Sequence, residues 1–339
     1  MKSARKFLCL VLCLFLWIPL FSACRKTPDQ PNEPKGENTE PIGTEGLSYF
    51  PFSDGTYGVK VGMAKYMEEI IIPPTYGGKP VTRILDEAFR EAENLRSVKI
   101  PSGVTSIGES AFEDCVELTS LVIPDSVTVI EESAFEGCVG LVSVMLLEPL
   151  TEIGDFAFSG CESLSELTLP DSVKTIGASA FEGCRSLTSV SFHEGVTSIG
   201  EAAFLGCESL REIVLPSSVT EIGGAAFSEC KLIESVALSE NLKTIEWGLF
   251  SGCEALVTVT VPDAVESIGF RAFFGCRSLA TLTIPDSVTS IGDDALYACD
   301  AMTDLYFTGT KDQWKRIQKG EMHNDTVITI HYNYVPNEM

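Results

Sequence analysis

Apolar residues recur along most of the chain in a short pattern that is repeated many times. In the copy that begins at Leu118, Leu121 and Ile123 alternate with polar residues, which predicts a short strand with one buried face. Pro124 predicts the end of that strand, since proline cannot continue a central ladder. The remaining apolar residues point back to the same interior, the last ones as on a short helix or 3₁₀ turn: Val127, Ile130, Ala134, Phe135, Cys138 and Leu141.

The interval between copies is 23 residues, and it is visible as columns of identical residues. Cysteine recurs at this step as Cys115, Cys138, Cys161, Cys184, Cys207, Cys230, Cys253, Cys276 and Cys299. Phenylalanine keeps the same step from Phe89 to Phe273, and isoleucine keeps it from Ile84 to Ile291. A fixed period in the low twenties is typical of a solenoid, in which each unit contacts only its neighbours.

The predicted fold class is therefore a solenoid with a curved parallel β-sheet of short strands, turns and short helical or 3₁₀ segments. One unit alone cannot cover its apolar face, but ten stacked units form a continuous core. Strands about 4.8 Å apart give a sheet roughly 50 Å long. We expect β-rich caps at both ends, because uncovered terminal strands would pair with other chains.

The unit from Leu118 to Leu141, L-x-x-L-x-I-P-x-x-V-T-x-I-x-x-x-A-F-x-x-C-x-x-L, resembles the BspA-like (Treponema-type, 23-residue) leucine-rich repeat of surface proteins. The segment Tyr49–Val61 resembles the hairpin that caps such repeats. We expect a signal peptide, a disordered tether, an N-terminal cap with a lead-in unit, ten repeats and a C-terminal cap at 1–23, 24–46, 47–80, 81–310 and 311–339. Several units depart from the pattern and put local turns in doubt: Leu147, His193 and Ser239 replace the proline, and Glu131 and Glu246 replace the glycine.

The N-terminus carries the layout of an export signal. Lys2, Arg5 and Lys6 precede an apolar run of 15 residues from Phe7 to Phe21, which is too short for a typical spanning helix. The run ends in small residues before Cys24, and this resembles a bacterial lipobox, although Phe21 stands where leucine is usual. We therefore expect lipidation of Cys24, and the alternative is ordinary peptidase cleavage after Ala23.

The proline-rich residues 25–46 have little to bury, so we expect an extended tether of about 70 Å at most. The whole chain has a formal charge of −24, and removal of residues 1–23 leaves 21 basic and 48 acidic residues, or −27. This balance argues against nucleic acid as a partner, which requires a basic face. It also predicts repulsion from anionic lipid, so that membrane contact is expected only through the lipid anchor.

Nine repeat cysteines raise the question of a metal or disulfide site. One cysteine per unit gives a row rather than a tetrahedron, and parallel Cβ vectors do not favour disulfides. We expect buried, unpaired thiols that pack as small apolar groups. The chain has three histidines (His193, His323 and His331) and no G-x-S-x-G motif, so we predict no catalytic residues, no metal and no cofactor.

The outward positions of the predicted strands are the candidate binding site. They carry small, hydroxyl-rich and largely uncharged side chains, in contrast to the acidic turns. The tentative ligand-binding residues are Ser143, Met145, Glu166, Thr168, Ser189, Ser191, Glu212, Val214, Ser235, Thr258 and Thr260. One interpretation is a concave surface that holds a partner, and the other is that serine and threonine merely suit a solvated strand.

The lipobox-like segment and the missing catalytic residues predict a bacterial cell-surface lipoprotein that binds without catalysis, and the family resemblance implies adhesion to host proteins or to other cells. The expected partner is an extracellular protein. Two further hypotheses remain open from the sequence, namely a structural spacer of a surface complex and a glycan-capturing lipoprotein.

Overall fold

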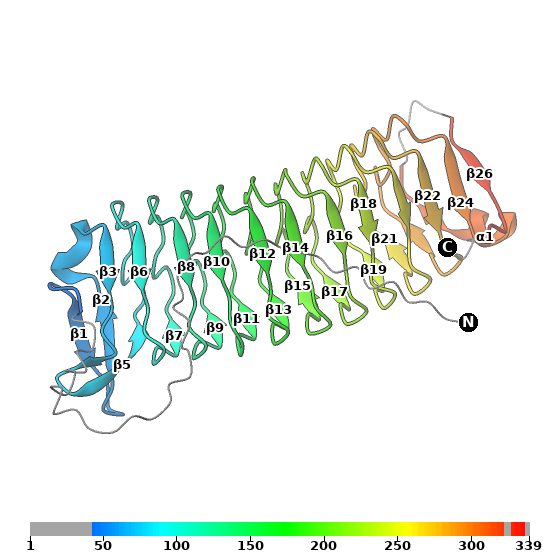
Figure 1. Ribbon diagram of the computed structural model, residues 1–339. Helices are drawn as coiled ribbons and strands as arrows, with labels where there is room; N and C mark the ends of the chain where they lie inside the picture. The colour runs from blue at the N-terminus through cyan, green and yellow to red at the C-terminus, as the bar shows by residue number, and fades with distance from the viewer. Residues whose placement is uncertain (1–42, 322–326, 336–339) are drawn as a thin grey trace, which may run out of the picture. The chain divides into compact units, whose positions relative to one another are not determined.

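The computed structural model describes residues 43–321 and 327–335, which belong to one compact unit, Glu40–Met339. This unit is a succession of short strands and turns that repeats along one axis (Figure 1). Each turn of the solenoid contributes strands to two parallel ladders, and residues 23 apart are paired. No helix in the described ranges is long and apolar enough to cross a bilayer.

The long-strand ladder consists of twelve strands, most of them three residues long. They are β3 (Glu69–Ile71), β6 (Ser97–Lys99), β8 (Ser120–Val122), β10 (Ser143–Met145), β12 (Glu166–Thr168), β14 (Ser189–Ser191), β16 (Glu212–Val214), β18 (Ser235–Ala237), β20 (Thr258–Thr260), β22 (Thr281–Ile284), β24 (Asp304–Phe307) and β26 (Thr329–His331). The inward residue at the centre of each strand is apolar, as the alternation in the sequence predicts.

The short-strand ladder is formed by the segment of each unit that corresponds to V-T-x-I. From the sequence, the apolar residues of this segment are predicted to point inward, but no strand is predicted there. Its members are β5 (Lys79–Ile84), β7 (Ser106–Ile107), β9 (Val129–Ile130), β11 (Glu152–Ile153), β13 (Thr175–Ile176), β15 (Ser198–Ile199), β17 (Glu221–Ile222), β19 (Thr244–Ile245), β21 (Ser267–Ile268), β23 (Ser290–Ile291) and β25 (Gln318–Lys319). Because most of these strands have only two residues, they are too short for an alternation of apolar and polar residues to be recognised in the sequence.

The two ends of the repeat are covered by different elements. At the N-terminal end, β1 (Ser48–Pro51) and β2 (Tyr57–Lys60) form an antiparallel hairpin, and β2 pairs with β5. The 3₁₀ helix η1 (Gly62–Tyr66) follows, and β4 (Thr75–Tyr76) pairs with the start of β5. At the other end, α1 (Lys311–Arg316) begins with a capping box between Thr310 and Gln313 and buries Trp314.

The third side of each unit consists of hydrogen-bonded turns, where the sequence predicts short helices or 3₁₀ segments. The bonds run from residue i to i−3, as from the Cys184 N–H to the Phe181 carbonyl at 3.2 Å. Two residues per unit adopt a left-handed backbone, for example Ser179 (φ 51°) and Gly183 (φ 69°). A left-handed residue every fourth position stops a right-handed helix from continuing, which explains the difference.

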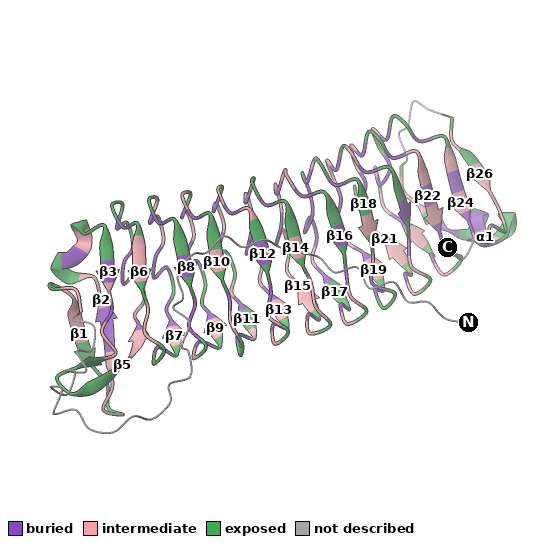
Figure 2. Ribbon diagram, viewed as in Figure 1, coloured by how far each residue is buried: buried purple, intermediate pink, exposed green. Residues whose placement is uncertain are grey.

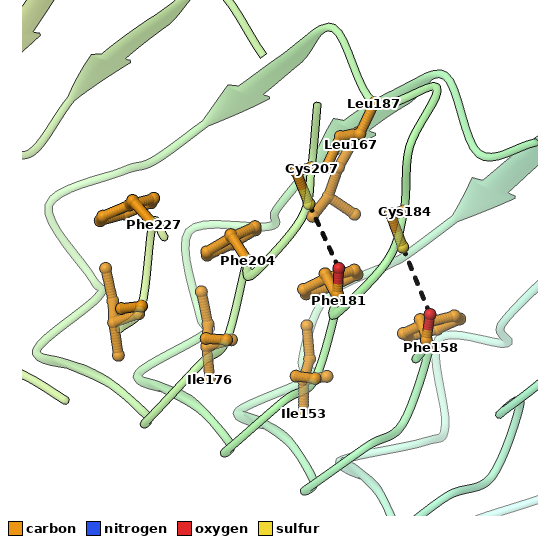
Figure 3. Close-up of a cluster of buried hydrophobic side chains, with 14 of the residues drawn as sticks. Ile153, Phe158, Leu167, Ile176, Phe181, Cys184, Leu187, Phe204, Cys207 and Phe227 are labelled. Carbon is orange, nitrogen blue, oxygen red and sulfur yellow. Dashed lines mark hydrogen bonds between the residues drawn. The ribbon is translucent and has the colours of Figure 1, made fainter. Parts of the chain in front are cut away.

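The core is a stack of identical side chains (Figure 3), and buried positions recur in every unit along the solenoid (Figure 2). Nine phenylalanines from Phe89 to Phe273 are fully buried, and neighbouring rings lie parallel with centroids 4.9–5.9 Å apart. Each repeat cysteine donates its thiol hydrogen to the carbonyl of a phenylalanine in the preceding unit, as from Cys184 to Phe158 at 3.3 Å. The nine thiols are free and buried, as the sequence predicts.

The glycine column sets how closely successive units approach. A Cβ at Gly200 would lie 2.5 Å from the backbone nitrogen of Ala178 in the preceding unit, far inside contact distance. The two units that carry glutamate in this column have weakened pairing. Beside Glu131, β9 and β7 share only the pair Ile107–Ile130, and beside Glu246, β19 is not paired with β17. These departures alter the strand pairing locally and leave the fold intact.

We expect Gly200→Ala to lower the free energy of unfolding by about 1–3 kcal/mol, because the added methyl group overpacks a backbone contact. The matched control is Gly103→Ala, where the nearest atom lies at 3.8 Å and the change should stay within about 0.5 kcal/mol. Urea unfolding followed by circular dichroism measures both. Equal midpoints for the two variants would contradict the close approach.

A second expectation concerns the thiol row. Burial raises the pKa of the Cys184 and Cys299 thiols to about 12, whereas a thiol in the unfolded chain ionises near pH 8.5. Between these values the unfolded state releases protons that the folded state retains, so stability falls as pH rises, by about 1.4 kcal/mol per pH unit for each such thiol. Urea midpoints from pH 7.5 to 10 should therefore fall less steeply for Cys184→Ser than for the wild type. Identical slopes would show that this thiol ionises in the folded protein.

Candidate functional site

The eleven predicted ligand-binding residues lie on one face of the long-strand ladder, here called the ladder face. They occupy strands β10 to β20, and all eleven are exposed. They stand on either side of the inward residue of each strand, so they form two columns along the solenoid. The structure thus brings them together on a single surface.

Strand register fixes which of these side chains are neighbours. Glu166 pairs with Ser189, and Thr168 pairs with Ser191. Glu212 pairs with Ser235, which in turn pairs with Thr258. Further along, the hydroxyls of Thr258 and Thr281 are 2.9 Å apart. A partner that lay along the axis would therefore meet hydroxyl and carboxylate groups in alternation.

The ladder face also carries exposed apolar side chains. Met145 is 56% exposed and Val214 is 55% exposed. Val122, at 52%, pairs directly with Met145, so the two form an apolar spot that the sequence-based residue set did not include in full. The signal that could have found Val122 is its place in the same outward column, 23 residues before Met145.

From β8 to β18 the strands of this ladder pair two by two, whereas β20, β22, β24 and β26 are paired continuously. Pairing is complete between β8 and β10, β12 and β14, and β16 and β18, but it is absent between β10 and β12 and between β14 and β16. The sequence follows the same period of 46 residues: Leu147, His193 and Ser239 follow the second strand of each pair, and Pro124, Pro170 and Pro216 follow the first. At the unpaired junctions a serine hydroxyl still donates to the preceding unit, as from Ser172 to the Leu150 carbonyl at 2.6 Å, and the same bond occurs at the paired β20–β22 junction, from Ser287 to the Val265 carbonyl at 2.7 Å.

Shallow grooves open where the pairing is interrupted. One of about 320 Å³ lies between β10 and β12 and is lined by Met145, Glu166 and Thr168. Another, of about 730 Å³, lies between β18 and β20, where only Ser235 and Thr258 are paired. The grooves place apolar, hydroxyl and carboxylate groups at recurring points of the ladder face.

The two histidines that the structure describes, His193 and His331, lie away from the ladder face and at its C-terminal end, respectively. His193, in the turn after β14, has its Nδ1 3.3 Å from an Asp171 carboxylate oxygen. His331 on β26 is 2.6 Å from an Asp304 carboxylate oxygen, and this hydrogen bond lowers the pKa of Asp304. Within 43–321 and 327–335 no three histidine, cysteine or acidic residues are grouped to hold a metal ion. His323 and Cys24 lie outside the described residues.

Comparison with known proteins places the repeat in a family. The model of the BspA type leucine rich repeat region, in six copies, matches residues 63–188, 174–303 and 248–322. A comparison with curated proteins gives no match.

Solved structures with similar chains are leucine-rich-repeat proteins. One from Bacteroides ovatus is 25% identical, with a TM-score of 0.48 over 86% of this chain and 99% of that one. A leucine rich cell surface protein from Faecalibacterium prausnitzii is 25% identical, with a TM-score of 0.44 over 82% and 98%. The pneumococcal vaccine antigen PcpA is 18% identical, with a TM-score of 0.51 over 86% and 93%, and is alike in fold. From its repeat units and the family match, the chain belongs to the BspA type leucine-rich-repeat family.

Proposed function

We propose that this protein is a surface-anchored, non-catalytic binding module that holds a protein partner on the ladder face. The observation that carries the proposal is the set of eleven exposed side chains in two registered columns, none of which contributes to the apolar core. The fold requires only the inward residues, so the outward columns can be chosen for a partner. A non-catalytic role is typical of leucine-rich repeats, which present extended surfaces.

The chemistry of the ladder face favours a protein over a neutral glycan there. Its exposed groups are valine, methionine, serine, threonine and two glutamates, Glu166 and Glu212, and none of the eleven is aromatic. Apolar spots within a polar surround, such as Val122 with Met145, are the arrangement found in protein interfaces.

The proposed location of the module at the cell surface is based on the N-terminal sequence. The export signal and Cys24 support lipid anchoring, and the proline-rich residues 25–46 support a spacer that would hold the solenoid clear of a bilayer. Together with the family, they support display at a bacterial cell surface and adhesion to an extracellular protein.

Charge reversal on the ladder face tests the binding role. The full chain is screened against immobilised matrix proteins and mucins, and the double variant Ser189→Lys, Glu212→Lys is compared with Thr197→Lys, Glu221→Lys. Both variants change the charge by the same amount in the same two units, but the second lies at the short-strand ladder. The ladder-face variant should lose affinity at least tenfold, or about 1.4 kcal/mol, and the control should not.

Two outcomes of this screen would contradict the proposal. Equal loss in both variants would indicate general attraction to the acidic surface, and it would weaken further with salt. Saturable binding of soluble neutral oligosaccharides that is lost only in the ladder-face variant would favour the glycan hypothesis. No binding across the array would favour a spacer role.

The anchor is tested by Cys24→Ser. This variant cannot carry a thioether-linked lipid, so in a bacterial host the protein should move from the membrane fraction to the soluble or secreted fraction. Cys13→Ser, which changes another leader cysteine, is the control and should leave the protein with the membrane. A Cys24→Ser protein that remains membrane-bound would show that residue 24 is not the anchor.

A further inference from the structure

A second exposed surface lies next to the short-strand ladder, away from the ladder face. It is formed by Trp247, Phe270 and Phe274, with Arg271 among them, and is here called the aromatic strip. Trp247 is 44% exposed and Phe270 is 45% exposed, one unit apart in the same column. Earlier units carry glutamate, aspartate, alanine or glycine at this position, so the two large rings are a local departure from the repeat.

The solenoid is modified to accommodate Trp247. Its indole lies over Gly224 of the preceding unit, and a Cβ on that glycine would fall on the ring. Trp247 stands between Glu246, which replaces the glycine of the glycine column, and Gly248. Gly248 has a left-handed backbone (φ 60°), and the left-handed residues at the equivalent position of the other units are not glycine. The interruption between β17 and β19 lies at the same place (Figure 1). Several local changes thus combine to place one indole against Gly224 of the preceding unit while leaving it 44% exposed.

The rings of the strip already contact a cation within the chain. The Arg271 guanidinium lies over Phe270 at 4.8 Å from the ring centroid and over Phe274 at 5.0 Å, and it is paired with Asp294 at 3.6 Å. Among the described residues, no cationic group lies over Trp247. Tryptophan has the aromatic side chain that attracts cations most strongly.

The charged side chains in the column of Trp247 and Phe270 are negative, and the neighbouring Arg271 is paired with Asp294. The column that contains Trp247 and Phe270 has no basic residue, and its acidic members are Asp86, Glu109, Glu132, Asp155, Glu201 and Asp293. Glu201 and Asp293 are exposed on either side of the two rings, and neither forms an ion pair within 43–321 and 327–335. An acidic row with an aromatic face in it is complementary to a chain with several positive charges.

We propose that the aromatic strip is a docking site for a basic, arginine-bearing segment of a protein partner. One arginine of that segment stacks on the outward face of Trp247, and its neighbours pair with the carboxylates of the acidic column. Aromatic and arginine side chains are enriched where interfaces bind most strongly. The site is separate from the ladder face and does not depend on the function proposed for it.

A hexa-arginine peptide is the probe, and its binding to the full chain is measured by calorimetry in low and raised salt. Trp247→Ala should weaken binding about three- to tenfold, a loss in the range of one cation–π contact. Gly224→Ala keeps the indole but places a methyl group where the ring lies, so it should also weaken binding. The matched control is Tyr66→Ala, which removes an exposed ring at the other end of the solenoid (79% exposed) and should change nothing.

Two results would overturn the proposal. The first is equal affinity for the wild type, Trp247→Ala and Tyr66→Ala, which would reduce the interaction to attraction by the overall negative charge. The second is salt-insensitive binding of a neutral oligosaccharide that is lost in Trp247→Ala while hexa-arginine binding is unchanged, which would make the strip a glycan platform. Circular dichroism of each variant verifies that the solenoid is intact.

Discussion

The whole molecule depends on the short distance between successive turns of its backbone. Parallel pairing holds neighbouring strands about 4.8 Å apart, so every side chain in a column must stack on the equivalent side chain 23 residues away. Flat rings satisfy this condition, and the parallel column that includes Phe158, Phe181 and Phe204 follows from it. Thiols satisfy it too, because each one is small and donates to a carbonyl of the preceding unit. Where the backbones come closest, as at Gly200, a Cβ would lie only 2.5 Å from the backbone of the preceding unit, so glycine is favoured there.

The same constraint explains why the irregular units matter. A glutamate in the glycine column cannot be accommodated at the normal spacing, and pairing is weakened at Glu131 and lost at Glu246. The fold tolerates such units because each turn is held by several independent columns. At Glu246 the loosened junction coincides with the exposed indole of Trp247, so a local relaxation of the repeat accompanies the one large aromatic surface of that region.

The inward and outward columns of residues are therefore subject to different constraints. The inward ones are restricted to residues that stack, and they define the family. The outward ones on the ladder face are free to vary, and grooves beside Met145 and beside Ala237 divide the ladder into segments. The ladder face and the aromatic strip differ in chemistry, which allows one solenoid to engage two kinds of surface.

The sequence alone determined the period, the inward columns, the buried thiols and the residues of the ladder face, because a solenoid places residues 23 apart side by side whatever its finer geometry. It did not determine the short-strand ladder, since two residues per unit give no readable alternation, nor the turns that replace the expected helices. Pairing two by two has a sequence period of 46, but only the structure shows that it opens grooves. The aromatic strip was also decided by the tertiary structure: Gly224 and Trp247 are 23 residues apart, and only their stacking shows that one glycine makes room for one indole.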